Sequence, residues 1–291
     1  MNASELLKRI RRIHIRTSHM ASDVFAGQYH SAFKGQGIEF EEVREYQPGD
    51  DIRSIDWNVT ARHGRPFIKR FREERELTVM LLVDSSGSQA FGTAGQLKRE
   101  LVTEVGATLA FSAITNNDKV GLIAFSNEIE LHVKPAKGTR HVLRVIRDLL
   151  SFQPRHRGTD ITAALEHLNH VMRRKAVVFI ISDFQDSGYE KALRVVRRRH
   201  DVIPIVVRDP REVELPNVRF VELEDGESGR RVLVDTTSAA FREMYRRHAL
   251  SESAARDDMF RRMNTTAITL TTGESFVEPL TRYFRLRGRR Y

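Results

Sequence analysis

Two uninterrupted apolar segments constrain the fold of this 291-residue chain most strongly. They are LTVMLLV at residues 77–83 and AVVFII at residues 176–181. Unbroken apolar runs of this length are typical of strands that a parallel sheet buries on both faces. Both runs are far shorter than the roughly 20 residues that a membrane-spanning helix needs. The sequence therefore predicts at least two fully buried strands in a soluble protein.

Helical and strand-like segments alternate around these two runs. The pattern predicts further strands at 119–126, 128–133 and 201–207, and helices at 94–115, 139–150, 160–172 and 189–199. Strands that are separated by helices form crossover units, which favour a mostly parallel sheet in an α/β fold. Beyond these, the pattern predicts strands at 218–224 and 230–235, a helix at 238–263, a strand at 266–272 and a helix at 276–287.

The first 76 residues follow a different pattern. We expect a basic amphipathic helix at 3–18, a loop at 21–36, and strands at 38–46 and near 66–72. Trp57, the single tryptophan, is interpreted as core packing against the domain that follows. An acidic cluster is interpreted as structural, through salt bridges to arginines and capping of a turn. The acids are Glu39, Glu41, Glu42, Glu45, Asp50, Asp51 and Asp56, and the arginines are Arg44, Arg53, Arg62 and Arg65.

Composition excludes several classes of protein. The chain has no cysteine, which rules out a disulfide scaffold, a zinc–thiolate site and a cysteine nucleophile. The net charge is +9, but the arginines are dispersed among 39 acidic residues, so solvated helix faces are favoured over a nucleic-acid surface. The basic N-terminus lacks the apolar run of a secretory signal. We expect a soluble, cytoplasmic protein.

A run of hydroxyl and carboxylate side chains follows the first buried strand. In Asp84-Ser85-Ser86-Gly87-Ser88, three oxygen-bearing side chains stand at positions i, i+2 and i+4 of a turn that contains a glycine. Such oxygens suit a hard cation such as Mg²⁺. Taken alone, the same run fits an ordinary turn and helix cap equally well.

Two further segments favour the metal site. Thr159 precedes a predicted helix and can present its hydroxyl from a loop, and Asp183 follows the strand at 176–181. In doubly wound sheets, ligands bind beyond the carboxyl ends of the strands, where the strand order reverses. If the two apolar strands are neighbours, Asp84 and Asp183 meet at that edge. His156 could line the rim of this site, although a surface loop histidine is the favoured interpretation.

These five positions resemble the metal-ion-dependent adhesion site of von Willebrand factor A domains. The resemblance implies that Ser86, Ser88 and Thr159 ligate a metal directly, and that Asp84 and Asp183 do so directly or through water. It also implies one open coordination position that a partner's carboxylate fills. The expected ion is Mg²⁺, with Mn²⁺ or Ca²⁺ as alternatives.

Segments outside the metal motif resemble the bacterial family called domain of unknown function 58. The resemblance spans about residues 5 to 287 and implies a chaperone-like or adaptor role beside MoxR-type AAA+ ATPases. The segments that carry it are Phe33–Phe40, Val43–Arg53, Ile55–Asn58 and Phe71–Glu76.

Three functions remain open on sequence alone. The favoured one is a non-catalytic, metal-dependent protein-interaction module, since no Walker A loop and no nucleophile–base pair is evident. The first alternative is a Mg²⁺-dependent phosphohydrolase with Asp84 as nucleophile. Haloacid-dehalogenase-type phosphatases normally carry a second Asp two residues later, and here that position is Ser86. The second alternative is an arginine-rich nucleic-acid-binding protein, whose affinity would fall steeply with salt.

The overall expectation is a doubly wound, mostly parallel sheet of six strands in the order 3-2-1-4-5-6, with strand 3 antiparallel. We assign the A domain to residues 77–224. Residues 1–76 form a β-containing addition at the N-terminus, and residues 225–291 form an α+β extension that packs on the A domain.

Overall fold

The computed structural model describes residues 23–33, 38–73 and 76–289. The basic helix expected at residues 3–18 lies outside these ranges. Within them, no helix combines the length and the apolar character that crossing a membrane requires.

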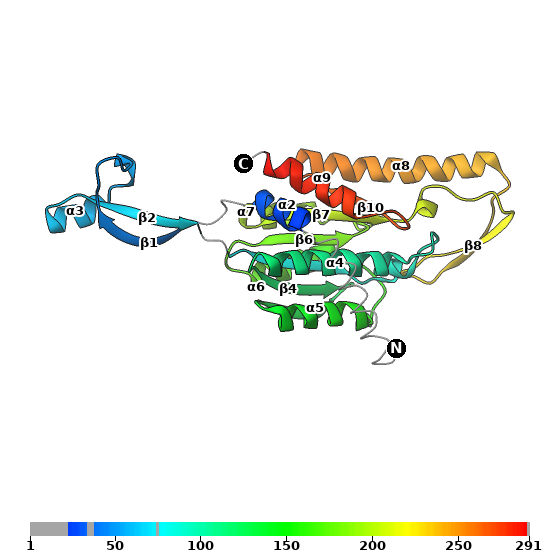
Figure 1. Ribbon diagram of the computed structural model, residues 1–291. Coiled ribbons are helices and arrows are strands. Elements are labelled where there is room, and N and C mark those ends of the chain that lie inside the picture. The colour runs from blue at the N-terminus through cyan, green and yellow to red at the C-terminus, as the bar shows by residue number, and fades with distance from the viewer. Residues whose placement is uncertain (1–22, 34–37, 74–75, 290–291) are drawn as a thin grey trace.

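A six-stranded sheet forms the centre of the fold (Figure 1). Its strands lie in the order β10-β7-β6-β3-β4-β5. Strands β4 and β5 pair antiparallel, and the other four neighbouring pairs of this sheet are parallel. The predicted order 3-2-1-4-5-6 with an antiparallel third strand is therefore confirmed for the first five strands, but the sixth strand is β10 and not the predicted strand at 218–224, which lies outside this sheet. The strands are β3 (Thr78–Asp84), β4 (Lys119–Phe125), β5 (Ile129–Ala136), β6 (Val177–Ser182), β7 (Asp201–Arg208) and β10 (Ile268–Thr271).

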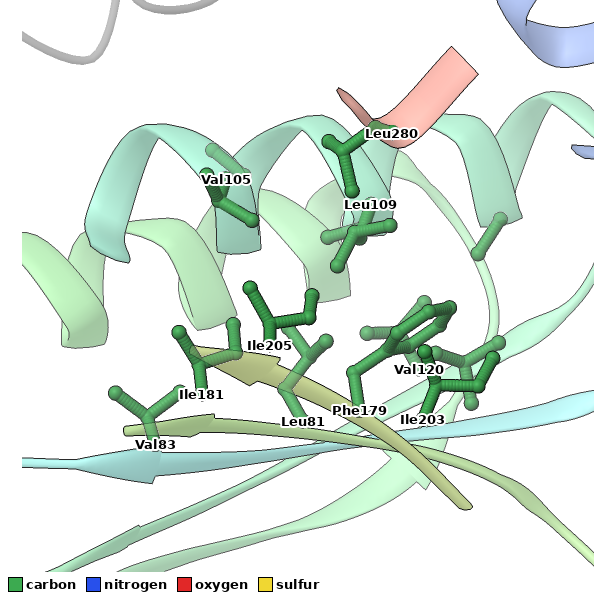
Figure 2. Close-up of a cluster of buried hydrophobic side chains, with 14 of the residues drawn as sticks. Leu81, Val83, Val105, Leu109, Val120, Phe179, Ile181, Ile203, Ile205 and Leu280 are labelled. Atoms are coloured by element: carbon green, nitrogen blue, oxygen red, sulfur yellow. The ribbon is translucent and has the colours of Figure 1, made fainter. Parts of the chain in front are cut away.

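Alternate side chains of β3 enter two separate cores, one on each face of the sheet. Leu81 and Val83 belong to the first core, and Met80 and Leu82 belong to the second. Figure 2 shows Leu81 and Val83 beneath side chains such as Leu109. Burial on both faces explains why the 77–83 run is apolar without interruption. Each fully buried side chain of this size contributes about 1.5–3 kcal/mol.

Helices cover both faces of the sheet. Three helices pack their side chains in the first core: α4 (Lys98–Thr115), α5 (Thr139–Ser151) and α9 (Val277–Gly288). Two helices pack in the second core: α6 (Ile161–Val171) and α7 (Glu190–Arg199).

An additional helix, α2 (Asp23–Phe33), lies within the range expected to be a loop, so that expectation is wrong. Tyr29 and Phe33 are one helical turn apart, and both are buried in the first core. The Phe33 ring lies 5.7 Å from that of Phe284 in α9, centroid to centroid. Because Gly27 lowers the helix propensity of this segment, the helix depends on this aromatic packing as well as on its own sequence.

A two-stranded arm leaves the sheet where β3 begins. Strands β1 (Ile38–Glu45) and β2 (Phe67–Glu73) form where strands were predicted, pair antiparallel, and carry the short helices η1 (Ile52–Ser54) and α3 (Trp57–His63). Figure 1 shows this arm extending away from the central sheet. Trp57 is 68% exposed, so its interpretation as core packing against the A domain is wrong. The arm projects outward, and the tryptophan therefore has no core to enter.

Those acidic side chains of the arm that the structure describes form ion pairs and cap a helix, which is the structural role that was predicted. Arg44 pairs with Asp50 at 2.7 Å, and Arg65 pairs with Glu45 at 3.3 Å. Asp56 accepts hydrogen bonds from two backbone N–H groups at the start of α3. These contacts stabilise the turn and the helix end.

The C-terminal part of the chain contributes to the central sheet. Strands β8 (Phe220–Glu224) and β9 (Arg231–Asp235) form a separate hairpin, followed by α8 (Ala239–Arg262). Strand β10 then pairs with β7, and α9 packs in the first core. The sheet thus takes its sixth strand from the range assigned to the extension, so residue 224 is not the end of the sheet domain.

Asp118 is a buried carboxyl at the start of β4. The Tyr29 hydroxyl donates to it at 3.2 Å, and the Leu77 N–H donates at 2.9 Å. Burial outweighs these hydrogen bonds and raises the pKa of Asp118 to about 7. Asp118 therefore joins α2 to the edge of the sheet while holding a proton that the unfolded chain would release.

Asp118→Asn should flatten the pH dependence of stability. Since the folded pKa is raised, this group's contribution to stability is complete below about pH 4 and is lost as the pH rises through about 7. Each pKa unit corresponds to about 1.4 kcal/mol, so the loss amounts to a few kcal/mol. Urea unfolding between pH 4 and 8 measures it. An unchanged pH slope in Asp118→Asn would contradict the assignment.

Candidate metal centre

The pairing of β3 with β6 brings two carboxylates to one edge of the sheet. Val83 lies opposite Ile181, so the residues that follow, Asp84 and Asp183, leave adjacent strands together. Both are at least 97% buried, and the Ser182 hydroxyl donates to Asp84 Oδ2 at 2.6 Å. Strand order reverses at this point, because β3 continues to β4 on one side and has β6 on the other.

The turn after β3 gathers its hydroxyl groups. The Ser86 backbone N–H donates to Asp84 Oδ1 at 2.9 Å, which folds the turn back on the strand end. The Oγ atoms of Ser86 and Ser88 lie 3.0 Å apart. Ser86 precedes the short helix η2 (Gly87–Ala90) but makes no side-chain capping bond to it. The Ser86 side chain therefore does not cap this helix, although the sequence pattern allowed that interpretation.

The loop that carries Thr159 lies against this turn. The Gly87 N–H donates to the Arg157 carbonyl oxygen at 2.8 Å, and Asp160 caps the start of α6. Between these two anchors, the Thr159 hydroxyl donates to Glu227 Oε1 at 2.6 Å. The fold thus brings Asp84, Ser86, Ser88, Thr159 and Asp183 to the same end of the sheet.

Negative charge accumulates at this edge. Burial, followed by the charge of Asp183, raises the pKa of the Asp84 carboxyl to about 7, against hydrogen bonds from Ser182 and Ser86. Two carboxylates that repel each other in a buried setting favour a nearby cation. The site therefore suits a positive charge at neutral pH.

Lys98 supplies one such charge, and sequence reasoning missed it. Its Nζ lies 2.8 Å from Asp183 Oδ2 and 2.5 Å from Glu212 Oε1, and the side chain is fully buried. Burial alone would lower the pKa of Lys98, but the charges of Asp183 and Glu212 outweigh burial and raise it. The sequence feature that could have identified Lys98 is its position as the first residue of α4, because the helix dipole disfavours a cation there unless an acidic partner is near.

Gln89 is a second residue that sequence reasoning missed. Its side chain is 2% exposed, yet neither amide atom has a hydrogen-bond partner among the residues that the structure describes. A buried polar group without a partner is costly, so a water or a ligand is expected beside it. The residue directly follows Ser88.

The donor set fits a small hard cation. Adjacent oxygens around an octahedral Mg²⁺, bound at 2.0–2.1 Å, are about 2.9 Å apart. The 3.0 Å between Ser86 Oγ and Ser88 Oγ matches that spacing. Both oxygens of Asp183 already accept hydrogen bonds, from Lys98 and the Gln185 N–H, so a role through water suits it better than direct ligation. In the described ranges no three His, Asp or Glu side chains form a metal cluster, which leaves the hydroxyl groups as the main donors.

His156 lies in the loop before Thr159 and faces Glu130. Its Nδ1 is 3.3 Å from Glu130 Oε1, and its backbone N–H donates to the same oxygen at 3.1 Å. This matches the favoured interpretation of a surface loop histidine.

The fold is that of a von Willebrand factor A-like domain. The sheet order, the antiparallel edge strand and the helices on both faces are those expected from the resemblance. The chain belongs to the family described as "Protein of unknown function DUF58", whose model matches residues 42–255.

One relative and two solved structures are similar to this chain. An uncharacterized protein of Mycobacterium tuberculosis (strain H37Rv) is 31% identical over 290 residues, which cover 98% of this chain and 90% of that protein. The crystal structure of BatB from Bacteroides thetaiotaomicron matches with a TM-score of 0.50 and 14% identity, over 73% of this chain and 99% of that one. An aerotolerance-related membrane protein from Bacteroides fragilis matches with a TM-score of 0.50 and 16% identity, over 74% and 100%. These two structures show a shared fold.

Lys98→Met should destabilise the protein strongly. The change keeps the apolar stem but leaves Asp183 and Glu212 without their cation, which costs about 3–5 kcal/mol for a broken buried pair. Urea unfolding measures the loss, and adding Asp183→Asn should recover part of it. Lys191→Met, at an exposed position of α7, is the control. A loss below about 1 kcal/mol in Lys98→Met would contradict a buried ion pair.

Proposed function

We propose that this protein is a metal-dependent protein-interaction module without catalytic activity. In this proposal a divalent cation, Mg²⁺ in the first place, is held by Ser86, Ser88 and Thr159, with Asp84 and Asp183 acting directly or through water. The observation that carries the proposal is the pair of serine hydroxyls 3.0 Å apart beside two buried carboxylates.

Each residue has a separate task in this site. The serines and Thr159 offer neutral oxygen donors, which leave most of the ion's charge uncompensated. Asp84 and Asp183 supply the negative charge that favours the cation, and Lys98 holds one oxygen of Asp183 in place. When bound, the ion supplies a positive centre with an open position for a partner's carboxylate.

The identity of Ser86 supports binding over catalysis. A phosphatase of the haloacid-dehalogenase type would need a proton donor two residues after its nucleophile, and a serine hydroxyl is a poor general acid at neutral pH. Here the Ser86 hydroxyl instead lies beside that of Ser88. A Mg²⁺-dependent phosphatase activity that Asp84→Asn abolishes would overturn the non-catalytic proposal.

The proposed partner is a MoxR-type AAA+ ATPase or one of its clients. Membership of the family supports this, since the resemblance implies an adaptor role beside such ATPases. An acidic side chain on the partner would provide the carboxylate.

Ser86→Ala combined with Ser88→Ala should abolish Mg²⁺ binding without unfolding the protein. Both changes remove hydroxyl oxygens and leave no unpaired charge, so the thermal midpoint should stay close to that of the wild type. Isothermal titration calorimetry with Mg²⁺ and with Mn²⁺ measures the affinity. Ser151→Ala with Ser187→Ala, at exposed positions, is the matched control. Wild-type affinity in the Ser86/Ser88 variant would contradict the site.

Partner binding should require the metal. A pull-down with the purified MoxR-type ATPase of the same organism should succeed in Mg²⁺ and fail in EDTA. The Ser86/Ser88 variant should fail in both conditions. Binding that survives chelation would overturn the metal-bridge mechanism.

A further inference from the structure

The tip of the β8–β9 hairpin, residues 225–229, packs directly on the candidate metal centre. A Cβ added at Gly226 would lie 2.8 Å from the Ser88 backbone nitrogen. A Cβ added at Gly87 would lie 1.9 Å from the Gly226 carbonyl oxygen. The two backbones therefore touch at a pair of glycines, and neither position has room for a side chain.

The tip presents a carboxylate to a proposed metal ligand. Glu227 Oε1 accepts the hydrogen bond from the Thr159 hydroxyl at 2.6 Å. Two oxygens that share the octahedral shell of a small divalent ion stand about 2.9 Å apart, so this spacing is close to that of neighbouring ligands. The chain thus has a carboxylate of its own beside the site to which a partner's carboxylate would bind.

The local turn fixes Glu227 in this place. Asp225 Oδ1 accepts the Glu227 backbone N–H at 3.0 Å, and Asp225 Oδ2 accepts the Ser228 hydroxyl at 2.7 Å. Gly229 closes the turn at φ +69°, a conformation that favours glycine. Asp225 and Gly229 therefore shape the loop, while the Glu227 side chain remains exposed and reaches Thr159.

The rest of the hairpin is weakly held. Strands β8 and β9 pair with each other and with no other described strand. Phe220 and Leu233 are 64% and 69% exposed, so the hairpin buries little apolar surface. A two-stranded hairpin is marginally stable by itself. Figure 1 shows it apart from the central sheet, so the core does not depend on the position of the hairpin strands.

We propose that Glu227 is an internal carboxylate ligand, which occupies the open position of the metal centre and must be displaced before a partner's carboxylate can bind. This rests on the proposed metal site. The hairpin then acts as an autoinhibitory arm, and whatever draws its tip away exposes the ion.

The test compares the Mn²⁺-loaded full chain with its Glu227→Gln variant. Water-proton relaxation counts the water molecules bound directly to Mn²⁺, and a titration with acetate measures the affinity for a free carboxylate. Glu227→Gln should gain one bound water and bind acetate about tenfold more tightly, since a competing internal state lowers the apparent affinity. Glu227 is exposed, so the variant should fold normally.

Two further variants separate this effect from general changes in the hairpin. Glu222→Gln removes an exposed carboxylate that lies 3.7 Å from Arg231 in the same hairpin, and it should behave as the wild type. Gly226→Ala keeps Glu227 but pushes the tip away from Ser88, so it should reproduce the gain of Glu227→Gln.

The outcomes distinguish the two proposals. Failure of the wild-type chain to bind Mn²⁺ would overturn the metal site, and this inference with it. Normal Mn²⁺ binding, with the same water count and acetate affinity in Glu227→Gln as in the wild type, would overturn only the role of Glu227.

Discussion

The parallel pairing of β3 with β6 is the constraint on which the candidate site depends. It places Asp84 and Asp183 at one edge of the sheet, where both are buried and where burial and the charge of Asp183 make ionisation of Asp84 unfavourable. The nearby structure moderates this repulsion. Lys98 begins α4 at a position where its ammonium reaches Asp183, and the Ser182 hydroxyl donates to Asp84. One lysine does not neutralise all the carboxylates at this edge, so the site still favours a cation.

Segments far apart in the chain complete this edge. The Arg157 carbonyl oxygen holds the turn at Gly87, and the hairpin tip at Gly226 packs against the same turn. Residues of the A-like frame and of the C-terminal part therefore meet at a single place. A movement of the hairpin would change access to Thr159 without any change in the sheet, which offers a simple physical basis for control of binding.

The N-terminal arm lies at the opposite edge of the sheet. Strand β2 leads into the start of β3, whereas the proposed metal residues follow its end. The arm exposes Trp57 and Ile52, and ion pairs such as Arg44–Asp50 stabilise it locally. The fold therefore separates the arm from the metal centre by the length of the central strands, so that changes in one need not disturb the other.

The sequence by itself determined which segments form the central strands and which residues stand at their carboxyl ends. Apolar periodicity is local, and it reports whether one or both faces of a segment are buried. Periodicity does not report which segments touch. The burial of Lys98, the contact of Glu227 with Thr159 and the exposure of Trp57 all depend on residues tens of positions away or on the direction in which an arm extends. For the same reason, only the tertiary structure decided that Tyr29 belongs to a helix and that β10 completes the sheet, because packing against distant side chains and strand pairing fix both.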